Sequence, residues 1–202
     1  MLLEINTHNP EYPKIKETVT RLKQCGVIVY PTDTIYGLGC DIFCPEAIDQ
    51  IYKIKHKKAT GFSFVCSDLK EIAKYAHVSD TAYRIMKKVL PGPYTFVFKA
   101  TKLVPQRLIP DKKTVAIRIP DNKICLEIVK QLGHPIVSTS VNISGEPNYS
   151  DPLEIEKEFG SQVDIIIDAG IIENEPSTVI DFSTDKPTLI RQGKGSIEFL
   201  DI

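Results

Sequence analysis

Helical and strand-like patterns alternate along the chain, and this alternation constrains the fold more than any other feature of the sequence. Most amphipathic segments with helical spacing are followed by a short apolar run that stops at proline, glycine or polar residues. Interleaving of this kind predicts an α/β protein, in which helices pack on a central sheet. The last strand-like runs are short and closely spaced, which favours a mixed sheet over a purely parallel one.

The predicted helices carry apolar residues on one face, and several begin at a capping residue, such as Asp121, or end at a glycine, such as Gly133. Helices are predicted at 11–24, 45–58, 68–75, 80–89, 121–132 and 153–159. Strands are predicted at 27–30, 62–66, 94–99, 114–119, 136–139, 164–168, 178–181, 188–191 and 197–200. No repeat or linker divides the sequence. We therefore predict a single α/β domain with an open, twisted, mixed sheet and flanking helices.

Composition and charge exclude several classes of protein. Hydrophobic residues make up 42% of the chain and charged residues 25%, as is usual for globular proteins. The formal net charge of -1 gives no overall attraction to nucleic acids or membranes. No apolar run reaches membrane-spanning length and no export signal is recognisable, so a cytoplasmic protein is expected. The five cysteines, an odd number, are expected to be reduced thiols, and no cysteine–histidine cluster predicts a metal site.

The first candidate site is the stretch PTDTIYGLG, which follows the strand predicted at 27–30. An ordinary turn explains its glycines but not its many polar side chains. Hydroxyl and carboxylate groups could hold a small polar ligand, while glycines let the backbone approach it, and ligand loops often lie at strand ends. The residues concerned are Thr32, Asp33, Thr34, Tyr36, Gly37 and Gly39.

A second polar stretch, STSVNISG at 138–145, begins in the last two residues of the strand predicted at 136–139 and continues beyond it. Five of its eight residues carry hydroxyl or amide groups. Helix capping explains one or two of these groups, but not all of them. Two such loops side by side would form a polar cleft suited to phosphate oxygens.

Two sets of cations could serve this cleft. The run KIKHKK, residues 53–58, ends the second predicted helix, where lysines either complement the helix dipole in solvent or bind phosphate. Arg118 lies in the apolar strand at 114–119, on the same face as Ala116. A buried arginine needs an anionic partner, either an internal acid or a bound carboxylate or phosphate, and the sequence leaves both open.

The chain lacks the common P-loop, dinucleotide, nucleophile-elbow and zinc-protease motifs, but seven short motifs resemble those of one family. PTDTIYGLG, Lys55-x-Lys57, PGPYT, Arg118-x-Pro120, STSVNISG, PSTVID and Arg191-x-Gly193 occur in the order seen in the YrdC-like threonylcarbamoyl-adenylate synthases. The resemblance extends from about Gly26 to Gly193. It implies a single YrdC-like domain over residues 1–202, without the additional C-terminal domain of longer relatives.

The resemblance implies an enzyme, a nucleotidyltransferase that combines L-threonine, bicarbonate and ATP into threonylcarbamoyl-AMP and releases pyrophosphate. This L-threonylcarbamoyladenylate synthase activity serves the threonylcarbamoyladenosine modification of tRNA. Mg²⁺ would accompany ATP, and downstream proteins would transfer the threonylcarbamoyl group to tRNA. Some members of the family bind double-stranded RNA, so tRNA or double-stranded RNA is a further candidate partner.

Site residues follow from the same resemblance. The implied threonine site comprises Thr34, Tyr36, Arg118, Ser138, Ser177 and Thr178. The implied ATP site comprises Lys55, Lys57, Thr114, Ser140, Asn142, Asn148 and Arg191. Because three anionic species must be held together, cations and backbone donors matter more than a dedicated base. No residue is assigned as a general base or as a metal ligand.

Three positions depart from the synthase pattern and resemble the YciO-type branch of the family. Lys57, Gly61 and Cys66 stand where the synthases usually have arginine, asparagine and histidine. Lysine cannot reproduce the planar fork that arginine offers to a phosphate. Two alternatives therefore stay open: a YciO-type nucleotide- or double-stranded-RNA-binding protein with weak or no synthase activity, and an enzyme that adenylates a different small carboxylate or carbamate.

Overall fold

The computed structural model describes residues 1–56, 62–108, 113–184 and 186–200. Its helices are α1 (Tyr12–Lys23), α2 (Pro45–Ile54), α3 (Leu69–Tyr75), α4 (Asp80–Val89), α5 (Lys123–Leu132) and α6 (Pro152–Phe159), with a short 3-10 turn η1 (Gln106–Leu108). Its strands are β1 (Leu2–Glu4), β2 (Ile28–Tyr30), β3 (Gly37–Asp41), β4 (Ser63–Val65), β5 (Ala76–His77), β6 (Tyr94–Ala100), β7 (Thr114–Arg118), β8 (Ile136–Ser140), β9 (Ile165–Asp168), β10 (Thr178–Asp181) and β11 (Thr188–Arg191).

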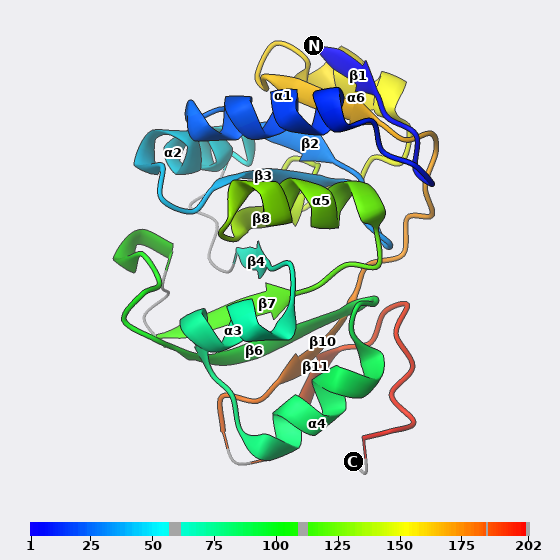
Figure 1. Ribbon diagram of the computed structural model, residues 1–202. Helices are drawn as coiled ribbons and strands as arrows, with labels where there is room; N and C mark the ends of the chain where they lie inside the picture. Colours follow the sequence, from blue (N-terminus) through cyan, green and yellow to red (C-terminus); the bar gives the residue numbers. More distant parts are fainter. Residues whose placement is uncertain (57–61, 109–112, 185, 201–202) are drawn as a thin grey trace.

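The strands of the described residues join one mixed sheet. Their order is β1-β9-β2-β3-β8-β4-β7-β6-β10-β11, and β5 pairs with β6 outside this path. Strand β9 is parallel to β1 and β2, β4 to β7, and β6 to β10, while the other neighbours are antiparallel. Figure 1 shows the sheet twisting from β1 at the top to β11 near the bottom. The predicted open, twisted, mixed sheet is confirmed.

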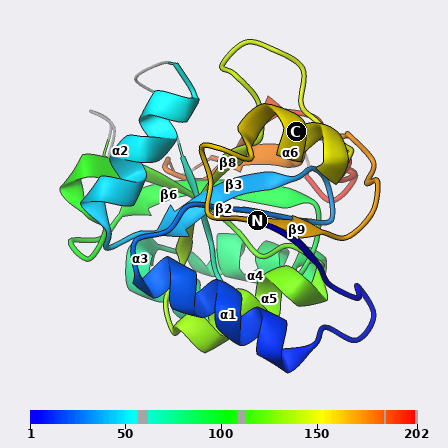
Figure 2. The same cartoon turned by 90° about the horizontal axis from the view of Figure 1, so that it is seen from above.

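Helices cover both faces of the upper part of the sheet. α1 and α5 lie side by side on one face (Figure 1), and α2 and α6 lie on the other (Figure 2). The alternation of side chains in a strand feeds both cores. Ile28 and Tyr30 pack with α1 and α5, whereas Val27 and Val29 belong to the larger core that includes α2 and α6. This larger core continues to the lower strands, where α3 and α4 cover the aromatic side chains of β6.

The predicted helices are confirmed to within a few residues, because their amphipathic spacing and their end signals agree. Pro45 occupies the first turn of α2, and Gly133 ends α5 with a left-handed φ of 88°. The cap of α5 is Asn122 rather than the predicted Asp121, since the Asn122 side chain accepts from the Cys125 N–H at 3.1 Å. Residues 57 and 58 of the second predicted helix lie outside the described residues.

Strand β3 corrects the prediction of a ligand loop that extends through Gly39. Residues Gly37–Asp41 pair antiparallel with β2 and with β8. A Cβ atom on Gly37 would lie 2.7 Å from the Tyr30 ring, and one on Gly39 would lie 2.5 Å from the Val137 carbonyl oxygen. Gly39 therefore makes room for Tyr30 and for β8, whereas Gly37 makes room for Tyr30 and also lines the cavity described below. The polar loop is correspondingly shorter and spans residues 31–36.

Besides β3, two short strands escaped prediction, and one predicted strand is wrong. β1 and β5 contain three and two residues, too few for a recognisable alternation. Residues 197–200 form a turn, closed by a hydrogen bond from Leu200 N to Ile197 O at 2.9 Å. The apolar residues of this turn pack on the main core, which explains why the segment reads as a strand.

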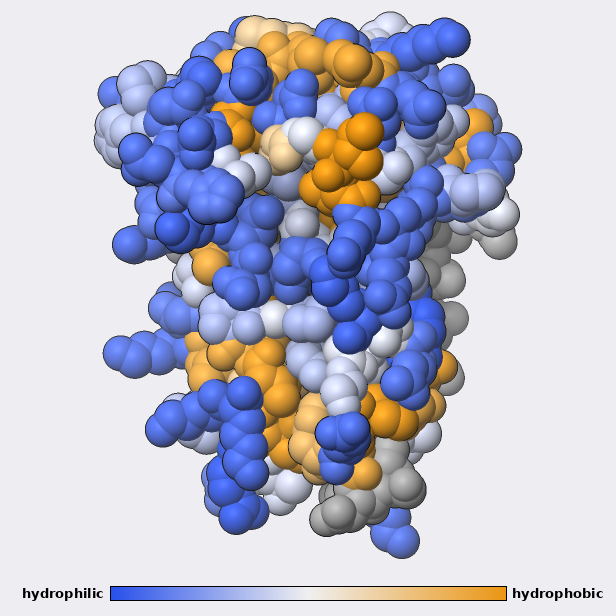
Figure 3. Space-filling model, turned by 90° about the vertical axis from the view of Figure 1, so that its right-hand side faces the viewer, coloured by the Kyte–Doolittle hydropathy of each residue, from blue (hydrophilic) through white to orange (hydrophobic). Residues whose placement is uncertain are grey.

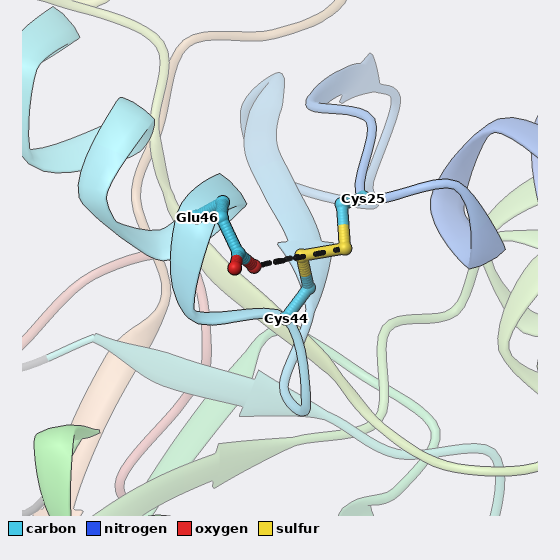
Figure 4. A group of neighbouring side chains, drawn as sticks. All are labelled: Cys25, Cys44 and Glu46. Atoms are coloured by element: carbon cyan, nitrogen blue, oxygen red, sulfur yellow. Dashed lines mark hydrogen bonds between the residues drawn. A yellow bond between two sulfur atoms is a disulfide. The ribbon is translucent and has the colours of Figure 1, made fainter.

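Cys25 and Cys44 form a disulfide, which corrects the expectation that all five cysteines are reduced. Cys25 follows the end of α1 and Cys44 precedes α2, and their Cα atoms are 5.6 Å apart (Figure 4). The other three cysteines, Cys40, Cys66 and Cys125, are free and buried. The pair arises from the packing of two helix ends, which a cysteine count does not show.

Within the described ranges, no helix is both long and apolar enough to cross a membrane. Figure 3 shows the side of the molecule formed by the right-hand edge of Figure 1. Groups of hydrophobic residues interrupt a mostly hydrophilic surface there, and the broadest lie in the lower half, at the height of α4 and the C-terminal segment.

Candidate functional site

A cavity of about 520 Å³ opens over the face of the sheet where side chains are small and polar. Strand register brings these side chains together, because Ser63 lies opposite both Ala116 and Ser138. Arg118, two residues beyond Ala116, shares their face. The residues between them on the same strands point into the hydrophobic core; they are Phe64, Ile117 and Val137. This sheet therefore has one face for the core and one hydroxyl-rich face for the cavity.

The cavity gathers residues that are distant in sequence. Seven predicted site residues line it: Thr114, Arg118, Ser138, Ser140, Asn148, Ser177 and Arg191. They come from β7, β8, β11 and the loops before α6 and β10. The two polar loops of the sequence also meet here, since Thr32 and Ile35 of the first loop lie in the same wall. The predicted polar cleft between these loops is thus present.

Arg118 is the buried cation of the cavity, and its side chain is only 6% exposed. Its Nη2 donates to Asp33 Oδ1 at 2.7 Å and to Thr34 Oγ1 at 3.0 Å. The internal acid expected as one alternative is therefore Asp33. Among the described residues, however, Arg118 Nε and Asp33 Oδ2 are buried without a hydrogen-bond partner. The protein itself therefore leaves one buried donor and one buried acceptor of this pair unsatisfied.

Lys55 follows the last residue of α2 and is 4% exposed. Its Nζ donates to Ser140 O at 2.8 Å and to Asn142 Oδ1. Ser140 Oγ donates to the same Asn142 oxygen at 2.7 Å, so the three side chains form one cluster at the cavity wall. Burial lowers the pKa of Lys55 to about 8. An anion bound beside Lys55 would restore its preference for the charged form, which suits a phosphate.

Ser177 and Arg191 form another part of the wall. Arg191 donates from Nη2 and Nε to Ser177 O at 2.8 Å and 3.2 Å. Ser177 Oγ lies 2.8 Å from Thr95 Oγ1 in a further hydrogen bond. Burial lowers the pKa of Arg191, and the positive charge of Arg118 lowers it further. An anion between these two arginines would relieve their repulsion.

Five predicted site residues do not line the cavity. Thr34, Lys55 and Asn142 instead contact residues that do. The Tyr36 hydroxyl donates to Gly170 O at 2.8 Å and fixes the loop after β9. Thr178 Oγ1 donates to Gly195 O at 2.7 Å and so holds the C-terminal loop. These last two side chains support neighbouring loops.

Of the three positions that depart from the synthase pattern, only one is described. Lys57, which is also a predicted ATP-site residue, and Gly61 lie outside the described residues. Cys66 is fully buried, and its backbone N–H donates to the Arg118 carbonyl oxygen at 3.0 Å. Its side chain is not part of the cavity wall.

The structure gives Asp33, a candidate of the first polar loop, a partner in Arg118. It also adds two residues that the sequence did not identify as site residues. Thr95 belongs to the PGPYT motif and lines the cavity. Lys194 donates to Glu173 Oε2 at 2.7 Å and to Asp33 O at 3.2 Å, and so ties three loops together. No sequence pattern marks Lys194.

A family model called Sua5_yciO_yrdC, described as "Telomere recombination", matches residues 20–193. The uncharacterized protein YciO of Escherichia coli is 41% identical over 197 residues, which are 96% of each chain. The crystal structure of E. coli YciO matches with a TM-score of 0.94 and 38% identity, over 99% of this chain and 98% of that one.

Two other similar proteins have names or ligands that bear on function. The threonylcarbamoyl-AMP synthase of Vibrio vulnificus is 30% identical over 184 residues, 89% of this chain and 98% of that protein. The crystal structure of P. abyssi Sua5 complexed with L-threonine matches with a TM-score of 0.90 and 27% identity. It covers 96% of this chain but only 57% of the Sua5 chain, which is therefore much longer.

Proposed function

The chain belongs to the Sua5/YciO/YrdC family, and from this premise we propose that it is an L-threonylcarbamoyladenylate synthase. The proposed reaction joins L-threonine, bicarbonate and ATP into threonylcarbamoyl-AMP, with release of pyrophosphate and water. ATP enters as its Mg²⁺ complex. The proposed setting is cytoplasmic tRNA modification, in which other proteins transfer the threonylcarbamoyl group to tRNA.

One observation carries the proposal: Arg118, Ser138, Ser140, Ser177 and Arg191 converge on one cavity. Its volume of about 520 Å³ lies in the usual range for small-molecule sites. Two arginines and several hydroxyls in one partly enclosed space suit a set of small anions, and the proposed reaction requires threonine, bicarbonate and a triphosphate together.

The threonine carboxylate would bind Arg118, which lines the cavity and whose Nε has no hydrogen-bond partner among the described residues. Ser138 and Ser177 add hydroxyl groups on the same wall. Asp33 Oδ2, the unpartnered acceptor beside Arg118, would accept from the threonine amine or hydroxyl. This assignment explains why both groups are buried without internal partners.

The phosphates would lie against Lys55, Ser140, Asn142 and Arg191. The neutral threonine amine attacks the carbon of bicarbonate or CO₂, and the resulting carbamate oxygen attacks the α-phosphorus. The bond from that phosphorus to the bridging oxygen then breaks, and pyrophosphate leaves. Lys55 and Arg191 would stabilise the charge that builds up on the leaving group. Positioning of three reactants in one cavity supplies most of the rate enhancement in this scheme.

A second candidate function has specific support: a nucleotide- or RNA-binding protein with weak or no synthase activity. E. coli YciO is more similar to this chain than the Vibrio synthase is, at 41% against 30% identity. Lys57 and Cys66 also depart from the synthase pattern. Contacts with RNA phosphates would be recognisable by binding that weakens steeply with salt.

The test incubates the purified chain with ATP, Mg²⁺, bicarbonate and L-threonine and follows pyrophosphate and the AMP adduct. Threonine-dependent release of pyrophosphate supports the synthase. Release with another amino acid or carboxylate points instead to a different adenylating enzyme. No release, together with salt-sensitive RNA binding, favours the second candidate.

Residue variants make this test specific. Arg118→Met combined with Asp33→Asn should abolish threonine-dependent release without leaving an unpaired buried charge. Arg107→Ala is the matched control, because Arg107 is 52% exposed, pairs with Asp49 and lies outside the cavity. If the double variant keeps full activity while it remains folded, the carboxylate assignment is wrong.

A further inference from the structure

The Cys25–Cys44 disulfide joins the end of α1 to the start of α2 and has no part in the proposed reaction. Its two sulfur atoms lie in different surroundings. Cys25 is exposed, whereas Cys44 is 4% exposed. A reagent from solvent therefore reaches the disulfide from the Cys25 side, and Cys44 is the sulfur that leaves.

The surroundings of Cys44 suit a leaving thiolate. Cys44 is the N-cap residue of α2, a helix of ten residues, and its side chain makes no capping hydrogen bond. The positive end of the helix dipole and the free N–H groups of the first turn stabilise a thiolate there. A thiolate that is stabilised in this way leaves a disulfide faster.

Glu46 opposes this effect. It lies in the first turn of α2, and its Oε2 is 3.3 Å from the Cys44 sulfur and 4.0 Å from the Cys25 sulfur (Figure 4). A carboxylate this close disfavours a thiolate, and it accepts a hydrogen bond from the Cys44 thiol once the disulfide has opened. The three residues thus provide a sulfur that a reagent can attack, a sulfur that can leave, and a carboxylate that lowers the stability of the leaving thiolate.

We propose that Cys25, Cys44 and Glu46 form a thiol–disulfide exchange site for low-molecular-weight monothiols such as glutathione. The thiolate of the monothiol attacks Cys25 Sγ, the bond to Cys44 Sγ breaks, and Cys44 leaves as a thiolate that takes up a proton. A second monothiolate then attacks the monothiol sulfur of this mixed disulfide, and Cys25 leaves as a thiolate that takes up a proton. The protein gains two electrons and two protons, and the two monothiols become their disulfide.

The test equilibrates the native protein with buffers of graded reduced and oxidised glutathione and counts free thiols by maleimide mass labelling. Exactly one pair, Cys25 and Cys44, should open and close reversibly, while the buried Cys40, Cys66 and Cys125 stay unlabelled. A disulfide that persists until the protein is denatured would overturn the proposal.

Single variants identify the direction of attack. Cys44→Ser should accumulate a mixed disulfide between glutathione and Cys25, because the resolving thiol is gone. The matched variant Cys25→Ser should accumulate much less, because Cys44 is buried. Equal trapping in both variants would contradict the assigned order of the sulfurs.

Glu46→Gln tests whether the Glu46 carboxylate slows reduction of the disulfide. Removing the negative charge makes Cys44 a better leaving thiolate, so reduction of the disulfide should become several-fold faster. Glu17→Gln, on the exposed face of α1, serves as the control and should change nothing. Unchanged or slower reduction in Glu46→Gln would show that the carboxylate does not act on this pair.

Discussion

At the scale of the residue, the Arg118–Asp33 pair dominates the energetics of the cavity. Both side chains are nearly buried, at 6% and 10% exposure, and their contact is 2.7 Å long. Loss of one partner leaves the other as an uncompensated buried charge, which is strongly destabilising. A change in this pair should therefore affect both the stability of the first polar loop and ligand binding in the cavity.

Arg118→Ala should lower the free energy of unfolding by about 3–5 kcal/mol at neutral pH. The double change Arg118→Met and Asp33→Asn should cost less than Arg118→Ala alone, because no unpaired charge remains. Urea unfolding at equilibrium measures both values. A loss below about 1 kcal/mol for Arg118→Ala would place this pair among ordinary surface ion pairs and contradict its burial.

Lys55 predicts how ligand binding depends on pH. Because burial lowers the pKa of Lys55 to about 8, the free protein loses this charge as the pH rises through that value. Affinity for ATP should be constant below the pKa and should fall above it, by up to about tenfold per pH unit. Titration calorimetry between pH 6.5 and roughly pH 9.5 tests this range.

Lys55→Met is the control for this pH dependence. Methionine is similar in length but carries no charge, so the variant should bind ATP weakly and equally across the range. A wild-type profile that stays flat above pH 8, or a Lys55→Met profile that still falls, would assign the titration to another group.

At the scale of the element, the helices could be predicted from sequence because spacing and end signals coincide. Strand β3 could not be, since its two glycines suggest a loop. The reason for them is tertiary: Tyr30 of β2 lies over Gly37 and Gly39, and its hydroxyl donates to Ser138 Oγ at 2.6 Å. The packing of a large side chain over the glycines of a neighbouring strand cannot be recognised from local sequence periodicity.

Gly39→Ala tests this interpretation of β3. Its Cβ would lie 2.5 Å from a backbone oxygen of β8 and 2.9 Å from the Tyr30 ring, so the strands must separate. We expect a loss of about 3 kcal/mol in the free energy of unfolding. Gly133→Ala, where φ is 88° and no atom lies within 4 Å, isolates backbone strain at about 1 kcal/mol. Equal losses of stability in the two variants would contradict the interpretation that close packing requires glycine at position 39.

At the scale of the whole molecule, the sequence predicted which segments carry polar groups but not which groups share a cavity. Seven of the predicted residues meet there, while Tyr36 and Thr178 hold loops behind it. Motif order alone does not distinguish a side chain that faces a ligand from one that fixes its neighbour. That distinction depends on strand register, which sets the face of each residue.

Ligand binding should stabilise the fold, because the cavity is lined by residues of strands from β3 to β11 in the sheet order. ATP at about 100 times its Kd should raise the free energy of unfolding by about 2.7 kcal/mol. The Lys55→Met variant should gain little at the same ATP concentration. Thermal unfolding with and without the nucleotide measures this difference, and an equal gain in both proteins would locate ATP elsewhere.

The pairing of β10 with β6 and with β11 also decides when the cavity can form during synthesis. Ser177 precedes β10 and Arg191 ends β11, and both line the cavity. Because these strands leave the ribosome after β7 and β8, a nascent chain exposes Arg118 and Ser140 before it contains the second arginine of the cavity. The wall with both arginines can therefore be completed only once β11 has emerged.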